Sequence, residues 1–99
     1  MRAVVEVLRL DGGGRMLVFE CPACKCDHSF DVERPGSRWT WNGDAMFPTV
    51  SPSLVVKLPR RGGGEQRCHL FLRAGVVEFL SDCSHSLAGR SVRLSVRNF

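Results

Sequence analysis

The sequence has no long hydrophobic run. None of its apolar segments approaches the roughly 20 residues that a membrane-spanning helix requires. The opening stretch MRAVVEVLRL is partly apolar, but it passes into DGGGR without the small-residue cleavage pattern of a signal peptide. We therefore expect a soluble cytoplasmic protein with no membrane partner.

Helical periodicity and internal repeats are also missing, because no segment carries an apolar helical face over ten residues. Strand-like patterns occur instead, in AVVEVLRL, RMLVFEC, SPSLVVKL and the strictly alternating SVRLSVR. Glycine runs at residues 12–14 and 62–64 are typical of hairpin loops. The sequence predicts one domain over residues 1–99, a small compact, mostly β, antiparallel fold of about six to eight short strands. SHSLAGR has room for one helical turn.

No dense block of one charge is present. The formal net charge is +4, and the basic residues are scattered along the chain. Such a small and dispersed excess does not indicate nucleic acid as the partner. The five cysteines are an odd number and two of them form CPAC, which favours a reduced compartment and a metal site over a set of disulfides.

The stretch CHLFLRAGVVEFLSDCSH, residues 68–85, has the pattern of a β-hairpin with reactive side chains at its open end. A turn centred on Ala74 and Gly75 keeps the charged Arg73 and Glu78 off the apolar face. A slip of one residue would move both charges onto apolar faces, so the pattern favours this register. Because Ala74 disfavours a positive φ, a three-residue loop with a glycine bulge stays open as an alternative.

In this register Cys68 and Cys83 are diagonal neighbours on the buried face, while His69 and Asp82 are diagonal neighbours on the more polar face. Such neighbours lie about 7 Å apart at the backbone, within reach of converging side chains. We therefore expect two separate tasks at this end of the hairpin. The cysteines contribute to a metal site, and the histidine and the aspartate orient one another for catalysis.

The metal site that the sequence predicts is a structural zinc site. Zinc in such sites takes four thiolate or imidazole ligands, and a CxxC turn presents two sulfurs to one ion. Cys21 and Cys24 make the first half, and Cys68 and Cys83 are the first choice for the second. The sequence leaves three substitutes open: His28, Cys26 and His85. Alternatively, Cys68 and Cys83 are only small buried hydrophobic residues.

Several short motifs occur in one order: CPAC with His28 four residues on, WTWNGD, PTVSPSL, CHLF, EFLSDCSHSLAG and SVRL. They span about residues 21–94, and together they are far more specific than any one of them. In these motifs the chain resembles a family of small proteins of phages and bacterial operons, formerly of unknown function. Members in bacterial ubiquitination-like operons act as deubiquitinase-like serine proteases. Lys25 departs from the pattern, since similar sequences often have glycine there, and Cys26 is an added thiol.

The resemblance implies a serine peptidase that removes or processes a ubiquitin-like protein, with the conjugates of that protein as substrates and E1-like and E2-like operon partners. It also implies that the nucleophile lies within the matched motifs. We expect Ser53, because it follows Pro52 and leads into an apolar run; Ser51 is the rival. His69 is the expected base, since the hairpin register places Asp82 beside it.

Two further assignments stay open. His85 replaces His69 as the base if the strand bends after Asp82, or if the hairpin adopts the slipped register. The turn at Asn42 and Gly43 offers an amide side chain and a backbone N–H for an oxyanion, but it also fits a plain turn. Competing functions are a noncatalytic zinc-binding module for nucleic acid or protein, and a hydrolase with a catalytic zinc beside a carboxylate such as Asp82.

Overall fold

The computed structural model describes residues 1–33, 36 and 38–99, and the expected all-β, antiparallel fold is confirmed. The described residues contain no helix long and apolar enough to cross a membrane. The strands are more numerous than the sequence predicts because several have only two residues and leave no pattern. In chain order they are β1 (Arg2–Ala3), β2 (Glu6–Arg9), β3 (Arg15–Glu20), β4 (Asp27–Asp31), β5 (Thr40–Trp41), β6 (Val50–Pro59), β7 (Glu65–Arg73), β8 (Val76–Phe79), β9 (Ser91–Arg93) and β10 (Arg97–Asn98).

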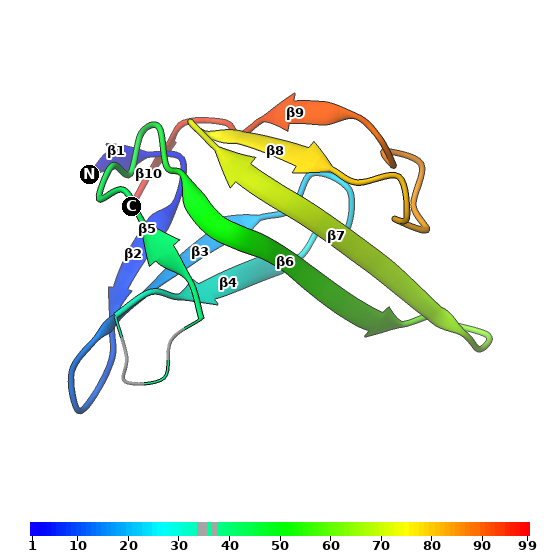
Figure 1. Ribbon diagram of the computed structural model, residues 1–99, viewed down its shortest axis with the longest axis horizontal. Helices are drawn as coiled ribbons and strands as arrows, with labels where there is room; N and C mark the ends of the chain where they lie inside the picture. The colour runs from blue at the N-terminus through cyan, green and yellow to red at the C-terminus, as the bar shows by residue number, and fades with distance from the viewer. Residues whose placement is uncertain (34–35, 37) are drawn as a thin grey trace.

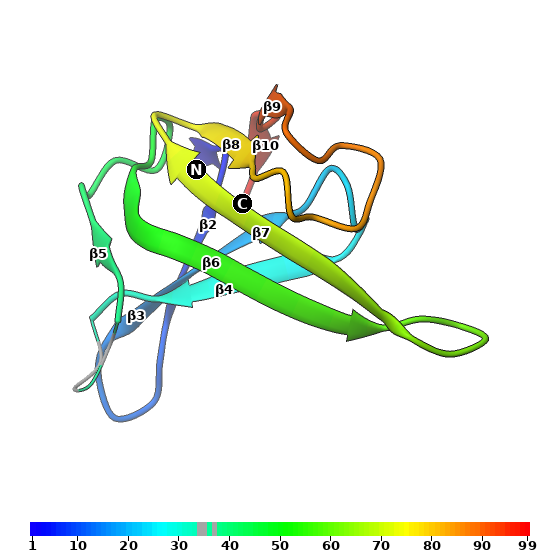
Figure 2. The same cartoon turned by 45° about the vertical axis from the view of Figure 1, so that its right-hand side comes forward.

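The strands form three antiparallel sheets. The largest has the order β5-β6-β7-β8-β9, a second has the order β2-β3-β4, and β1 pairs with β10. Figures 1 and 2 show the two larger sheets as two layers, with the long, curved β6 and β7 passing over β3 and β4. The two ends of the chain meet, since the Met1 ammonium group donates to the carbonyl oxygen of Phe99 over 2.7 Å.

The glycine runs close hairpins, as their sequence predicts. The first hairpin joins β2 to β3, with Val7 opposite Leu17, and the amide of Leu10 donates to the carbonyl of Gly14 across the loop. The sequence does not predict β4, which continues this sheet. Its buried positions are His28 and Phe30, and a histidine does not contribute to an apolar alternation.

The β7–β8 hairpin has the register that its charge pattern predicts. Arg73 pairs with Val76 and Leu70 pairs with Phe79. Ala74 adopts a positive φ of 49° and Gly75 one of 80°, so the turn has two residues and the alternative loop with a bulge is not formed.

The C-terminal alternation is broken in the structure. The sequence predicts one strand in SVRLSVR, but β9 ends at Arg93, and Leu94 turns inward to donate its amide to the carbonyl of Gly75. The chain then leaves the sheet to pair with β1. In SHSLAGR, the bonds Ala88 N–H to His85 and Arg90 N–H to Leu87 form turns instead of a helix.

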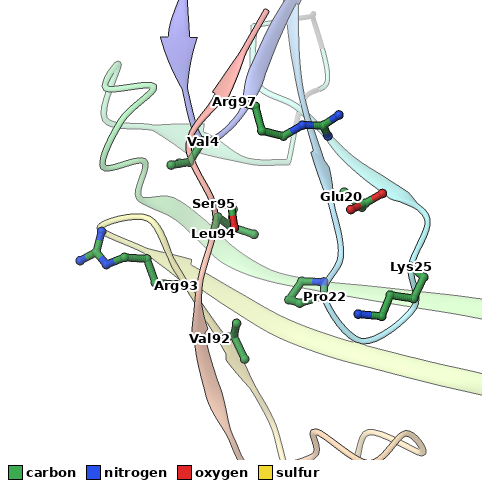
Figure 3. A pocket seen from close by; sticks show the side chains of 9 residues that line it. All are labelled: Val4, Glu20, Pro22, Lys25, Val92, Arg93, Leu94, Ser95 and Arg97. Atoms are coloured by element: carbon green, nitrogen blue, oxygen red, sulfur yellow. The ribbon is translucent and has the colours of Figure 1, made fainter.

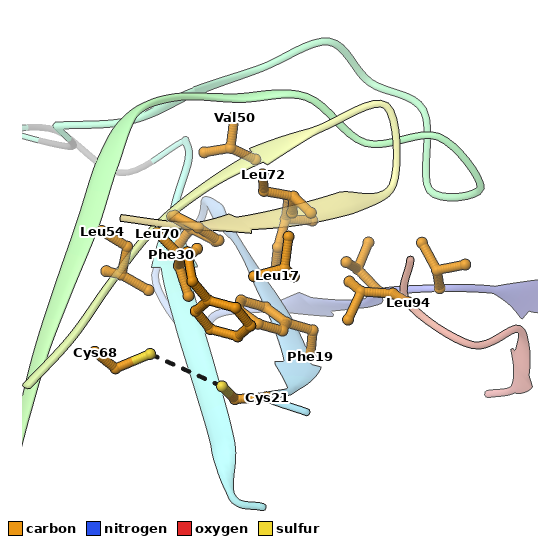
Figure 4. Packing of buried hydrophobic residues seen from close by; sticks show 14 of the residues in the cluster. Leu17, Phe19, Cys21, Phe30, Val50, Leu54, Cys68, Leu70, Leu72 and Leu94 are labelled. Atoms are coloured by element: carbon orange, nitrogen blue, oxygen red, sulfur yellow. Dashed lines mark hydrogen bonds between the residues drawn. The ribbon is translucent and has the colours of Figure 1, made fainter. Parts of the chain in front are cut away.

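The core lies between the inner faces of the two larger sheets (Figure 4). Leu17, Phe19 and Phe30 come from the β2-β3-β4 sheet, and they face Leu54 and Leu70 of β6 and β7. The rings of Phe19 and Phe30 stack with centroids 5.8 Å apart. Each such side chain contributes about 1.5–3 kcal/mol when fully buried, so this layer holds the two sheets together.

Candidate active site and metal centre

β7 presents two kinds of chemistry on its two faces. Because side chains alternate along a strand, the adjacent Cys68 and His69 point to opposite sides of the sheet. Cys68 is fully buried in the core, whereas the side chain of His69 is 20% exposed on the outer face. The metal-ligating and the catalytic candidates are therefore separated by the thickness of one strand.

Ser53, His69 and Asp82 form a continuous chain of hydrogen bonds on the outer face. Nε2 of His69 lies 3.0 Å from Oγ of Ser53, and Nδ1 lies 3.1 Å from each carboxylate oxygen of Asp82. With the proton on Nδ1, the histidine donates to the aspartate and accepts from the serine hydroxyl. This is the order of contacts that a nucleophile, a base and a group that orients the base require.

An irregularity in β6 brings Ser53 to the histidine. The pairing of β6 with β7 shifts register between Val50 and Leu54, and from Leu54 onward it is regular, with Val55 opposite His69. Ser53 lies within this shift. Its carbonyl oxygen accepts a hydrogen bond from the indole Nε1 of Trp39 at 3.3 Å, which ties the irregular segment to the body of the protein.

The turn after β8 holds Asp82 and its neighbours against β7. The amide of Cys83 donates to the carbonyl of Leu80 over 3.2 Å. The sulfur of Cys83 accepts from the backbone N–H of His69 at 3.2 Å and donates to its carbonyl at 3.1 Å. Arg67 lies 4.0 Å from Asp82. Cys83 therefore fixes the backbone of the histidine beside the aspartate that orients its ring.

The rival residues lie elsewhere. Ser51 is exposed and pairs with Thr40 of β5. In His85, Nδ1 accepts from the amide of Leu87 at 3.2 Å and the ring packs edge-on against Phe79. The ring of His85 therefore packs on Phe79, and among the described residues it bonds to Leu87 and not to Ser53 or Asp82.

Asn42 and Gly43, the expected oxyanion donors, belong to a tightly bonded loop. The side-chain amide of Asn42 donates to the carbonyl of Phe47 at 3.1 Å, and its oxygen accepts from the amides of Asp44 and Thr49. Gly43 has a φ of 84°. These bonds use the donors of Asn42 to shape the loop, which is the plain-turn role that the sequence left open.

A cysteine and histidine group lies on the inner face, arranged so that it could bind a metal ion. The ligand atoms of Cys21, Cys24, His28 and Cys68 all lie within 4.8 Å of one another. The sulfurs of Cys21 and Cys68 are 3.9 Å apart, as the dashed line in Figure 4 marks. The amide of Cys24 donates to the sulfur of Cys21 at 3.4 Å. Two elements far apart in the sequence therefore converge on one point.

The state of His28 fits metal binding. Its Nδ1 lies 3.2 Å from the carbonyl oxygen of Asp27, to which it can donate, and this leaves the lone pair on Nε2. That Nε2 is buried and has no hydrogen-bond partner among the described residues. An unpaired buried nitrogen is costly, and a metal ion would satisfy it. His28, which the sequence offers as a substitute ligand, lies on β4.

The other sequence candidates fall outside this group. Cys26 is exposed. Cys83 lies in a second group with Cys68 and His85, whose ligand atoms are also within 4.8 Å of one another. The structure thus brings three of the four first-choice ligands together, Cys21, Cys24 and Cys68, and places His28 where Cys83 was expected.

Hydrogen bonds and burial shift the pKa values of the three thiols of this group, Cys21, Cys24 and Cys68, in different directions. The bond from Cys68 lowers the pKa of Cys21 to about 3. The same bond, together with burial, raises the pKa of Cys68, and burial raises the pKa of Cys24. The lowered pKa of Cys21 favours its thiolate, the form in which cysteine binds metals.

A pocket of about 220 Å³ lies next to the CxxC loop, apart from the catalytic candidates (Figure 3). Its lining comes from the CxxC loop and the C-terminal segment, and includes Pro22, Lys25, Arg93 and Arg97. None of Ser53, His69 and Asp82 lines it. The side chain of His69 is 20% exposed and that of Asp82 46% exposed, so both are accessible from the outer face.

A small all-β protein with a hydrogen-bonded serine, histidine and aspartate on the surface of its sheet has the architecture of a serine hydrolase. The model of one protein family, the bacterial ubiquitination-like system serine protease (BubE), matches residues 2–80. The chain belongs to this family, so the expected resemblance and the class of enzyme are confirmed. The matched region contains Ser53 and His69 and ends just before Asp82. No curated protein and no solved structure matches the chain.

Proposed function

We propose that this protein is a zinc-stabilised serine peptidase of a bacterial ubiquitination-like system, which processes a ubiquitin-like protein or removes it from its conjugates. The observation that carries the proposal is the bonded chain from Ser53 through His69 to Asp82. Membership of the BubE family supports it independently. Operon partners of the E1-like and E2-like types, and a cytoplasmic location, follow from the same assignment.

In the proposed acylation step, the oxygen of Ser53 attacks the carbonyl carbon of the scissile bond and transfers its proton to Nε2 of His69. Asp82 stabilises the imidazolium that forms. The tetrahedral intermediate collapses when Nε2 returns the proton to the leaving amine, and the acyl group stays on Ser53. Water then attacks this ester, His69 takes the proton of the water, and the free carboxyl product leaves with the serine hydroxyl restored.

The proposed zinc is structural. Cys21, Cys24, His28 and Cys68 would supply four protein ligands, which leaves no open position for a substrate or an activated water. They lie on the inner face of the sheet, opposite Ser53. An ion there would fasten the CxxC loop and β4 to β7. This arrangement favours a serine mechanism over a catalytic-zinc hydrolase.

The test is covalent labelling. A fluorophosphonate probe should modify the wild-type protein at Ser53, identified by mass mapping of the labelled peptide. Ser53→Ala should lose the label, and Ser51→Ala should keep it. Labelling of Ser51, or no labelling of the folded protein, would contradict the assignment. Elemental analysis of protein purified without added metal should find one zinc per chain.

A further inference from the structure

We propose that the unpaired outer edge of β6 binds the substrate as an added antiparallel strand leading to Ser53, and that it selects a segment with an apolar residue opposite Val55 and an acidic residue opposite Lys57. The inference rests on the proposed peptidase function and specifies how its polypeptide substrate is held.

The register of β6 and β7 directs the backbone of Val55 outward. Val55 lies opposite His69. The carbonyl of His69 accepts from the amide of Leu80 at 2.9 Å, on the side of β8, so the backbone groups of His69 point away from β6. In an antiparallel pair, two opposite residues either exchange both hydrogen bonds or neither. The N–H and C=O of Val55 therefore point away from β7 as well.

Lys57, two residues further along β6, also directs its backbone outward. Lys57 lies opposite Arg67. The carbonyl of Arg67 accepts from the amide of Ser84 at 3.0 Å, and its amide donates to the hydroxyl of Ser84 at 2.8 Å. Lys57 consequently directs its N–H and C=O to the outer edge. Together with Val55 it offers four backbone hydrogen bonds in line, the pattern that a new strand requires.

Among the described residues, β5 covers only the start of this edge. β5 pairs only with Val50 and Ser51, and Figures 1 and 2 show it beside the start of β6. The carbonyl of Ser53 is taken by Trp39. Within the described part of the chain, no strand of the sheet pairs with the outer edge at Val55 or Lys57. The open edge therefore begins next to the nucleophile, about 7 Å from it at Val55.

The side chains along the edge define the occupant. Val55 is 48% exposed on the outer face. Lys57 is exposed on the same face, opposite Arg67. Opposite residues of an added strand share this face, so an apolar side chain suits Val55 and a carboxylate suits Lys57. A second copy of the chain pairing through this edge would bring both copies' lysine and arginine pairs into one sheet, and their repulsion favours a peptide instead.

Two probes of one chemistry test the proposal. Acetyl-alanine diphenyl phosphonate reaches only the nucleophile. Its pentapeptide counterpart, acetyl-Asp-Ala-Val-Ala-Ala diphenyl phosphonate, also places valine opposite Val55 and aspartate opposite Lys57. The wild-type protein should react with the pentapeptide roughly tenfold faster or more, the effect of one or two added hydrogen bonds. Equal rates for the two probes in the wild type would overturn the strand proposal.

Val55→Pro removes the outward N–H without removing a bond to β7. It should abolish the preference for the pentapeptide, measured as the ratio of the rates of the two probes, whereas the control Val55→Thr should keep the preference. A retained preference in Val55→Pro would contradict the proposal. If neither probe labels Ser53 in the folded wild type, the peptidase function itself fails and this inference falls with it.

Hydrogen exchange decides the matter even if the proline variant does not fold. In the wild-type protein the amides of Val55 and Lys57 should exchange fast, and they should become protected in the pentapeptide adduct. The amides of Leu54 and Val56 face β7 and serve as controls that are protected in both states. Unchanged exchange at Val55 and Lys57 in the adduct would overturn the proposal, and so would their protection by dimerisation of the protein alone.

Discussion

Cys68 and His69 are adjacent in β7, and their side chains lie on opposite faces of the sheet. Cys68 contacts Cys21 in the candidate metal group, and His69 contacts Ser53. Because neighbouring residues of a strand share their backbone, displacement of one displaces the other. A substitution in the candidate metal group is therefore expected to affect catalysis, although none of its cysteine or histidine side chains contacts the substrate.

The first prediction concerns this coupling. Cys68→Ser should remove the metal and lower the melting temperature markedly, because metal binding in small domains is coupled to folding. Peptidase activity should fall with it as β7 loses its anchor. Elemental analysis and thermal unfolding check both effects. Cys26→Ser is the matched control, since Cys26 is exposed and outside the group, and it should change neither.

A chelator separates the structural role from a catalytic one. If chelation abolishes activity while the protein stays fully folded, the metal takes part in the chemistry. Loss of activity that follows the unfolding curve is the expected result.

The second prediction concerns the nucleophile. Ser53→Ala should reduce peptide cleavage by roughly 10³-fold or more, because the covalent step is lost. Metal content and melting temperature should remain close to those of the wild type, since the lost hydroxyl leaves little space. Ser51→Ala should cleave normally. If instead Ser51→Ala is the inactive variant, the class of enzyme stands and the assignment of the serine does not.

The third prediction concerns Asp82. Asp82→Asn should depress turnover by roughly 10⁴-fold, the size of the effect in the best-studied serine protease, because the amide favours the wrong histidine tautomer. Steady-state kinetics and circular dichroism measure turnover and fold. Glu78→Gln is the control, since Glu78 is on the same face but pairs with Arg73.

The double variant tests whether the residues act as one unit. Asp82→Asn combined with His69→Ala should lose little more activity than His69→Ala alone, because effects within a catalytic unit are not additive. Independent, multiplicative losses would assign His69 and Asp82 to different sites.

Much of this site could be predicted because charge and hydrophobicity fix a strand register. Arg73 and Glu78 exclude the slipped hairpin, and that register alone sets His69 near Asp82. The fourth candidate ligand could not be predicted in the same way. His28 reaches the group from β4, and the packing of one sheet on another leaves no trace in a single sequence. The strands β5 and β10 could not be predicted either, because a strand of two residues is too short to show an alternation of apolar and polar residues.

The plain-turn role of Asn42 is one of the two alternatives that the sequence leaves open, but its bonds to Phe47 and Thr49 depend on how the loop folds back and could not be predicted. Lys25 is a partial exception. Its position after CPAC, where similar sequences often have glycine, has a φ of 59°, a conformation in which a side chain is strained. The resemblance to the family marks Lys25 as a departure from glycine, and the positive φ supplies its physical meaning.

The last prediction concerns Ala74 and Gly75, the two turn residues of the β7–β8 hairpin. Both have a positive φ, but their surroundings differ. Ala74→Gly should stabilise the protein slightly, by about 0.5 kcal/mol. Relief of the positive φ is worth about 1–2 kcal/mol, and the added freedom of the unfolded chain offsets about 0.4–1 kcal/mol of it.

Gly75→Ala should destabilise the protein by clearly more than that gain. The new Cβ would meet the carbonyl oxygen of Met46 at 3.1 Å, and the φ of 80° strains any side chain. Urea unfolding of both variants measures the two signs. The hairpin sets the distance from His69 to Asp82. Gly75→Ala should therefore lower activity by more than the fraction of unfolded protein accounts for. Equal stability changes at the two positions would contradict the prediction, because they would mean that the contact of Gly75 with Met46 does not limit the residue in the turn.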